Sequence, residues 1–214
     1  MKVDCHCHIL PGLDDGAQTL EDSVSLAGKL VEWGYTRAVC TAHSSFLYRN
    51  TPSSVQSACE LLIGELERRD IKLELVPSLE YRLIPETWLS VRAGHWLLPW
   101  ESNHILIELP IREPEKIGNI KPTDEIRWLL AEGYQPVLAH PERYQYLTLD
   151  DYRVLKDAGT QFQRNLGTIE GMYGEAVSDR AKVLDAAGMY EWVGSDLHNR
   201  KYAQFFDEHV FLKR

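Results

Sequence analysis

Short apolar segments alternate with longer amphipathic segments along the whole chain, and this alternation limits the possible folds more than any other feature. The short segments have the length and residue types of β-strands. There are about seven of them, near residues 2–7, 37–41, 73–79, 104–109, 135–139, 161–166 and 191–194. Alternating strands and helices predict an α/β fold in which helices cover a parallel sheet.

Capping signals define the starts of the first two helices. Thr19 and Asp22 are spaced as a capping pair before an amphipathic stretch. Thr51 precedes Pro52, and proline is favoured at the first helical position. Further helices are expected over 126–131, 149–158 and 175–187. The segment around Pro85, between the third and fourth strands, is expected to be irregular.

Length, charge and hydropathy exclude several classes of protein. The 214 residues contain no linker or low-complexity tract, so we expect one domain spanning 1–214. Asp and Glu number 32 against 23 Lys and Arg, a net charge of −9, which disfavours nucleic-acid partners and anionic membranes. No apolar run is long enough to cross a bilayer and no secretory leader opens the sequence, which predicts a cytoplasmic protein without stable membrane insertion.

Side chains that bind metals stand at the ends of nearly all predicted strands. The candidates are His6, His8, Asp15, His43, Glu80, Glu108, His140, Asp196 and His198. In a barrel of parallel strands the carboxyl ends converge on one face, so these side chains are expected to meet there. Imidazoles and carboxylates suit Zn, Mn and Fe. Nine ligands exceed the needs of one ion, so the pattern predicts two or three ions with bridging carboxylates, a centre that favours displacement at phosphorus.

The cysteines do not form the phosphate loop of a cysteine-dependent phosphatase. Such a loop needs an arginine six positions after the nucleophile, and the residues there are Pro11, Leu13, Phe46 and Glu65. Because alternate strand residues share a face, His6 and His8 are expected on one face of the first strand and Cys5 and Cys7 on the other. The four cysteines are interpreted as small buried hydrophobic residues.

Several motifs carry a resemblance to a known family. The segment from Asp4 to Ala17 (DCHCHILPGLDDGA) resembles the opening motif of the polymerase and histidinol phosphatase (PHP) superfamily. It is most similar to the bacterial manganese-dependent tyrosine-protein phosphatases of capsule and exopolysaccharide loci, the CpsB/YwqE type. The later motifs TAH, LE, IE, AHPERY and GSDLH follow in the same order. The resemblance implies an irregular, TIM-like barrel of seven βα units with a trinuclear metal site.

The resemblance also implies how the ligands are shared. His6, His8, Glu80 and Asp196 would hold one ion; Glu80, Glu108 and His140 a second; Asp15, His43 and His198 a third. Asp15 rather than Asp14 matches the ligand position. The implied metal is manganese, two to three ions in all, with iron and zinc as alternatives.

Two arginines are candidates for substrate contacts. Arg143, in the AHPERY motif, matches an arginine that grips the substrate phosphate, and it is the candidate catalytic and substrate-binding residue. Some relatives carry basic residues directly after the histidine of the second strand. Here the sequence Ser-Ser-Phe-Leu follows His43, and Arg49, the nearest cation, is the second substrate-binding candidate.

The implied reaction is hydrolysis of a phosphomonoester by hydroxide that the metals generate from water. The implied substrate is a phosphotyrosine protein, a bacterial tyrosine kinase of polysaccharide export, in the regulation of capsule or exopolysaccharide synthesis. Three alternatives remain open. One is a phosphatase of the same superfamily that acts on histidinol phosphate or another small molecule. A nuclease is disfavoured by the net charge of −9. A non-catalytic, metal-stabilised binding domain would be expected to have lost ligands.

Overall fold

A computed structural model describes residues 2–94 and 96–211, and its centre is a sheet of seven parallel strands. The strands pair in chain order: β1 (Val3–Cys7), β2 (Arg37–Ser44), β3 (Glu74–Arg82), β4 (His104–Glu108), β5 (Gln135–Ala139), β6 (Gln161–Asn165) and β7 (Trp192–Gly194). This confirms the predicted α/β class and each of the seven predicted strands.

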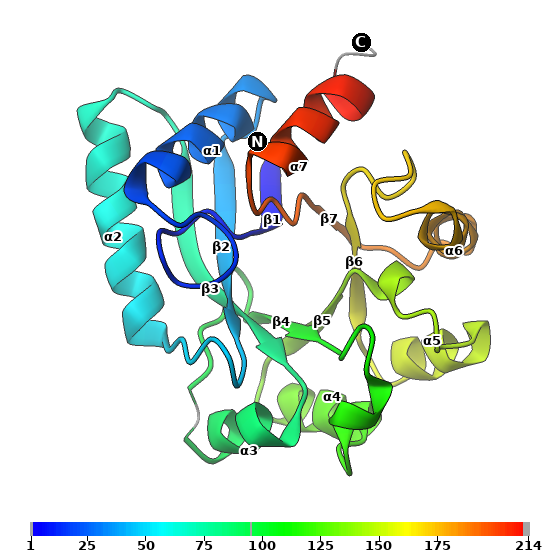
Figure 1. The fold of residues 1–214 in the computed structure, drawn as a ribbon. Coiled ribbons are helices and arrows are strands. Elements are labelled where there is room, and N and C mark those ends of the chain that lie inside the picture. The colour runs from blue at the N-terminus through cyan, green and yellow to red at the C-terminus, as the bar shows by residue number, and fades with distance from the viewer. Residues whose placement is uncertain (1, 95, 212–214) are drawn as a thin grey trace.

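The sheet curls into a nearly closed barrel (Figure 1). The segment after β7 returns to β1: the Asp196 amide donates to the His6 carbonyl at 2.7 Å, and the His8 amide donates to the Leu197 carbonyl at 3.0 Å. These two bonds join the last strand unit to the first. Consequently the carboxyl ends of all seven strands surround one space, as the spacing of the candidate ligands predicts.

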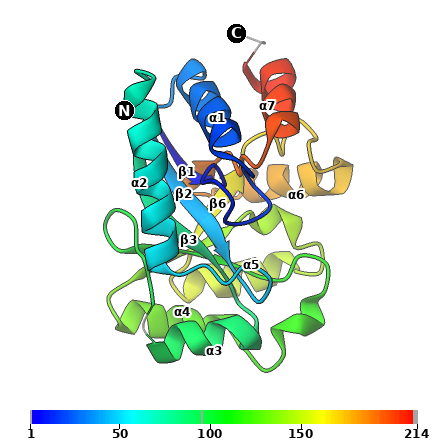
Figure 2. The same cartoon turned by 60° about the vertical axis from the view of Figure 1, so that its left-hand side comes forward.

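Helices form an outer layer around the strands (Figures 1 and 2). They are α1 (Leu20–Glu32), α2 (Pro52–Arg68), α3 (Pro85–Gly94), α4 (Pro122–Ala131), α5 (Leu149–Asp157), α6 (Glu175–Ala186) and α7 (Arg200–Phe206). The two predicted caps are present: the Thr19 side chain accepts from the Asp22 amide, and the Thr51 side chain accepts from the Ser54 amide. Within residues 2–94 and 96–211, no helix has both the length and the apolarity needed to cross a membrane.

The helix α3 corrects the sequence interpretation, which expected irregular structure around Pro85. Pro85 is the first residue of this helix, a position where proline costs nothing because the first amide has no partner inside the helix. Thr87, Trp88 and Val91 are buried on one face, and Trp88 donates to Glu125 on α4 at 2.9 Å. A buried face of only three residues is too weak a periodic signal to be recognised in a segment that also contains Pro85 and Pro99.

A bulge in β1 corrects a second expectation. Between Asp4 and Cys7 the register against β2 shifts, so three steps along β1 oppose two along its partner. Cys5 therefore packs in the small cluster formed by Val39 and other strand residues, whereas Cys7 packs in the large cluster beneath the helices. The prediction that Cys5 and Cys7 share a face is wrong, because simple alternation fails at a bulge.

Candidate metal centre

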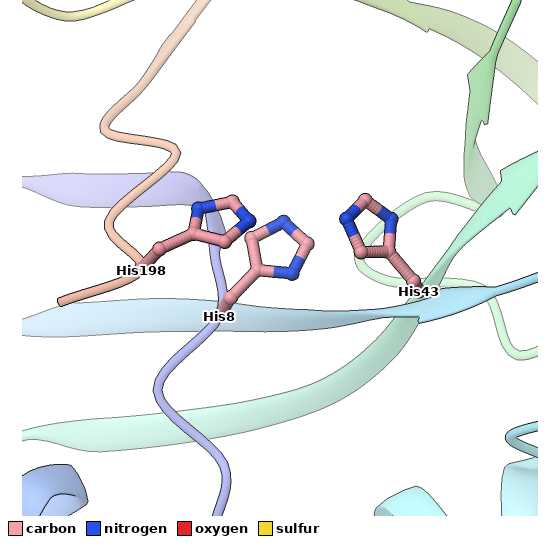
Figure 3. A group of neighbouring side chains, drawn as sticks. All are labelled: His8, His43 and His198. Carbon is pink, nitrogen blue, oxygen red and sulfur yellow. The ribbon is translucent and has the colours of Figure 1, made fainter. Parts of the chain in front are cut away.

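The barrel's carboxyl end brings the nine predicted ligands together. His6 and His8 come from β1 and its end, His43 and Glu80 from the paired strands β2 and β3, Glu108 from the end of β4, and His140 from the end of β5. Asp196 and His198 follow β7, and Asp15 lies in the loop before α1. Figure 3 shows three of these rings, those of His8, His43 and His198, with the His8 ring between the other two. Their ligand atoms lie within 4.8 Å of one another.

Two imidazole nitrogens lie close to each other and to two carboxylate oxygens. His6 Nε2 lies 3.0 Å from His8 Nε2 and 3.4 Å from both Glu80 Oε2 and Asp196 Oδ1. His8 Nε2 lies 3.4 Å from Glu80 Oε2 and 3.5 Å from Asp196 Oδ1. Ligand atoms about 2.1 Å from one ion, arranged as a tetrahedron, lie about 3.4 Å apart. The distances from the two nitrogens to each other and to both oxygens therefore have the spacing of metal ligands.

The remaining ligands extend this set on two sides. Glu80 Oε1 lies 3.1 Å from His140 Nε2, which is 3.9 Å from Glu108 Oε1. His43 Nε2 lies 3.4 Å from Asp15 Oδ1, and His198 Nε2 lies 3.7 Å from the same oxygen. Glu80 faces both sides, because its other oxygen is 2.9 Å from His43 Nδ1. A carboxylate in this position can bridge ions.

Hydrogen bonds on the far side of each ring orient three of the imidazoles. His6 Nδ1 lies 2.8 Å from the Gln163 side-chain oxygen, His8 Nδ1 lies 2.8 Å from Asp14 Oδ2, and His198 Nδ1 lies 2.8 Å from the Asp196 carbonyl. Each acceptor favours a proton on Nδ1 and so directs Nε2 of the ring toward the cluster. This is the arrangement by which proteins fix metal-binding histidines.

Asp14 contacts the ligand cluster too, although the sequence motif favoured Asp15. The Asp14 side chain is buried and accepts bonds from the His8 ring, the His43 amide at 2.9 Å and the Gly16 amide at 2.9 Å. The Asp15 side chain is 55 % exposed and points its oxygen at His43 and His198. The two adjacent carboxylates have different tasks, one orienting ligands and one available as a ligand. Their order in the sequence gave no signal of this difference.

The buried carboxylates of the cluster favour bound cations. Glu80 and Glu108 are buried, and one oxygen of each accepts no hydrogen bond of good geometry, although His43 Nδ1 and Arg82 Nε lie 2.9 Å and 3.5 Å away; His140 Nδ1 also lacks a partner. Burial and the neighbouring charge of Glu80 raise the pKa of Glu108 to about 7. Burial and the nearby Arg143 guanidinium lower the pKa of His140 to about 4, so that ring is neutral and can donate a lone pair. Divalent ions fit this donor set, since they would supply the missing partners of the carboxylates.

Two candidate ligands have a left-handed backbone conformation. His140 has φ of 33° and Asp196 has φ of 53°, in a region that residues other than glycine occupy uncommonly. Glycines allow the backbone to approach closely nearby: a Cβ on Gly194 would stand 2.5 Å from the His6 Cβ, and a Cβ on Gly16 would overlap the His8 carbonyl. Such conformations persist where surrounding structure enforces them, as is typical of functional sites.

Arg143 reaches the same cluster. Its Nη1 donates to Asp196 Oδ2 at 3.2 Å, and its guanidinium lies 4.8 Å from the centre of the Tyr173 ring. The neighbouring Glu142 is not its partner, because that buried carboxylate accepts bonds from the Asn165 amide and the Tyr190 hydroxyl. The arginine is therefore held in place while its side chain remains 24 % exposed.

A cavity of about 260 Å³ opens over the cluster, and Arg143 lines it together with six of the candidate ligands: Asp15, His43, Glu108, His140, Asp196 and His198. Tyr202 also borders it. A second arginine, Arg82 at the end of β3, borders it with Nε 3.5 Å from Glu108 Oε2. No motif singled out Arg82. Arg49, the other predicted substrate contact, instead lines an adjacent cavity of about 670 Å³ between the β2–α2 loop and α3.

A family model matches most of the chain. Residues 2–204 match the family model described as capsular polysaccharide synthesis, CpsB/CapC. The tyrosine-protein phosphatase YwqE of Bacillus subtilis is 31 % identical over 206 residues, covering 95 % of this chain and 80 % of that protein. The tyrosine-protein phosphatase CpsB of Streptococcus pneumoniae is 26 % identical over 215 residues, covering 92 % and 83 %.

Solved structures agree with this match. A structure from a study of B. subtilis YwqE and S. pneumoniae CpsB, described as unique metal-dependent tyrosine phosphatases, superposes with a TM-score of 0.83 at 29 % identity, covering 97 % of this chain and 87 % of that one. The histidinol phosphate phosphatase of Lactococcus lactis superposes with a TM-score of 0.59 at 11 % identity, covering 98 % of this chain and 92 % of that one. The second likeness supports the barrel fold alone.

Proposed function

The chain belongs to the CpsB/CapC family of capsular polysaccharide synthesis, and we propose that it is a metal-dependent phosphomonoesterase that hydrolyses phosphotyrosine in proteins. Relatives named tyrosine-protein phosphatases align with nearly the whole chain. The observation that carries the proposal is that His6 Nε2 and His8 Nε2 lie 3.0 Å from each other and 3.4–3.5 Å from oxygens of Glu80 and Asp196, beside the Arg143 guanidinium. Metal ligands and an anion-binding arginine on one cavity suit a phosphate ester.

We propose two to three divalent ions at this centre, manganese first, with iron or zinc as alternatives. The proposed ligands are His6, His8, Asp15, His43, Glu80, Glu108, His140, Asp196 and His198. When bound, such ions polarise the phosphoryl oxygens and supply a nucleophile from water at neutral pH. The neutral His140 ring and the Nδ1-anchored rings of His6, His8 and His198 are prepared to bind them.

Arg143 is the proposed catalytic contact to the substrate phosphate. Its planar guanidinium can hold two phosphate oxygens, and its bond to Asp196 keeps it oriented before the substrate arrives. A tyrosine phenolate, with a parent pKa of about 10, leaves without strong protonation. Arg49 lies in the adjacent cavity, so its proposed contact is with the substrate outside the phosphate position.

The proposed biological setting follows from the family and from the thiols. The substrate would be a phosphotyrosine protein, a bacterial tyrosine kinase of polysaccharide export, and the role would be regulation of capsule or exopolysaccharide synthesis. All four cysteines are free and buried, as expected for the reducing cytoplasm. We also propose that residues 1–214 act as one phosphatase domain, since the single barrel contains every proposed ligand.

A comparison of substrates tests the function. Purified protein supplied with Mn²⁺ should hydrolyse phosphotyrosine peptides with a kcat/KM well above its value for histidinol phosphate or phosphoserine peptides. A preference for histidinol phosphate would replace the proposal with small-molecule phosphatase activity. Absence of turnover on every phosphomonoester, with metals bound, would favour a binding domain instead.

A further inference from the structure

Three large apolar side chains are exposed beside the metal cavity. Phe46 is 54 % exposed and Leu47 77 % exposed in the β2–α2 loop, and Trp96, just beyond α3, is 42 % exposed. Scattered exposed hydrophobic residues need no explanation, but a group of them beside a cavity marks a binding surface. This loop carries Ser-Ser-Phe-Leu directly after the candidate ligand His43.

These side chains border a groove that continues from the metal cavity. Arg82 lines the metal cavity and also a neighbouring cavity of about 380 Å³, whose walls include Phe46, Leu47 and Ile84. Phe46 in turn separates that cavity from the one of about 670 Å³ that reaches Trp96. We call this path from Arg82 past Phe46 to Trp96 the rim groove. It runs over the loops after β2 and β3, at the same end of the barrel as the ligands.

The occupant of the rim groove follows from the chemistry of a protein substrate, and so this inference rests on the proposed function. When a phosphotyrosine side chain enters the metal cavity, the polypeptide on either side of that residue lies at the cavity rim. The other cavity that shares walls with the metal site, at His198, is bordered by the charged side chains of Asp22, Arg200 and Lys201. The rim groove also carries charged side chains, Arg82, Glu86, Glu113 and Lys116, but unlike the cavity at His198 it presents large exposed apolar side chains, those of Phe46 and Leu47.

We propose that the rim groove binds the substrate polypeptide next to the phosphotyrosine and selects a large apolar side chain, which packs on Phe46 and Leu47. Burial of one such side chain contributes about ten-fold in kcat/KM, equivalent to about 1.4 kcal/mol. The groove thereby distinguishes phosphotyrosine in proteins from free phosphate esters.

The test compares two phosphotyrosine peptides of one sequence, which carry leucine or serine at the positions flanking the phosphotyrosine, with p-nitrophenyl phosphate. The wild type should prefer the leucine peptide to the serine peptide by about ten-fold. Phe46→Ser/Leu47→Ser should remove that preference and lower the ratio of peptide to p-nitrophenyl phosphate kcat/KM by about ten-fold. Leu61→Ser on α2, at a site 55 % exposed and outside the groove, should change neither ratio.

The possible outcomes distinguish failure of this inference from failure of the proposed phosphatase function. If the wild type hydrolyses both peptides equally well, or if the double variant keeps the preference, the groove does not select the substrate although the phosphatase function stands. If the wild type hydrolyses p-nitrophenyl phosphate but neither peptide, the proposed function itself fails. Should the double variant not fold with its metals, Leu47→Ser alone, at the most exposed position, should show the same change at smaller size.

Discussion

Replacement of Arg143 by alanine isolates the contribution of the proposed phosphate contact from that of the metals. The Asp196 oxygen that Arg143 contacts at 3.2 Å also accepts from Asn165 Nδ2 at 2.6 Å and from the Tyr173 hydroxyl at 3.3 Å. Asp196 therefore keeps two partners in the variant and should stay in position to bind metal. Loss of activity in Arg143→Ala would then report on substrate rather than on metal binding.

The expected loss is about 10²-fold or more in kcat/KM, or about 3 kcal/mol, the usual effect of removing one preorganised donor to a developing charge. Arg143→Lys should recover part of it, because an ammonium group cannot hold two phosphate oxygens in one plane. Arg127→Ala on α4, where the arginine pairs with Asp124 at the surface, serves as the matched control and should retain wild-type activity.

The assay is steady-state hydrolysis of a phosphotyrosine peptide, with metal content and thermal unfolding measured on the same preparations. A variant with bound metals, an unchanged melting temperature and wild-type kcat/KM would refute the reasoning. The phosphate contact would then have to be sought at Arg82, the other arginine that borders the metal cavity.

Two further predictions concern residues around the centre. Asp14→Asn should weaken metal affinity about 10–100-fold, because an amide is a weaker partner for the His8 ring than the carboxylate that lies 2.8 Å from it. Titration with Mn²⁺ would measure the affinity, and an unchanged value would show that Asp14 does not orient His8. Replacement of all four cysteines by alanine should leave kcat largely intact, because all four are buried free thiols. A variant that folds and binds metal but has no turnover would require a thiol in the mechanism.

The periodic features of the sequence predicted the barrel correctly. Each strand is a short apolar segment, and the caps at Thr19 and Thr51 depend only on residues three positions away, so both can be recognised locally. The helix α3 was missed because its apolar face is short and Pro85 suggested a break where it in fact begins the helix. The bulge in β1 was missed because it depends on pairing with β2, which no local pattern records.

The candidate site, like the fold, could be predicted only in part from the sequence. The ligands could be proposed from residue type and from position at strand ends, whereas their partners could not. Gln163 orients His6 from 157 residues away, and Asp14 differs from Asp15 only by the direction in which its side chain points. Arg82 has no motif around it and is recognised only because the cavity brings it beside Glu108. Three-dimensional contacts of this kind require the structure.

The account depends most directly on the metal centre, and metal analysis of the purified protein tests it. Protein prepared without chelators and supplied with Mn²⁺ should contain two to three divalent ions per chain. It should lose phosphotyrosine hydrolysis on treatment with a chelator and regain it when Mn²⁺ is returned. Fewer than one ion per chain with no uptake of added Mn²⁺, or full activity after complete removal of metal, would contradict the account.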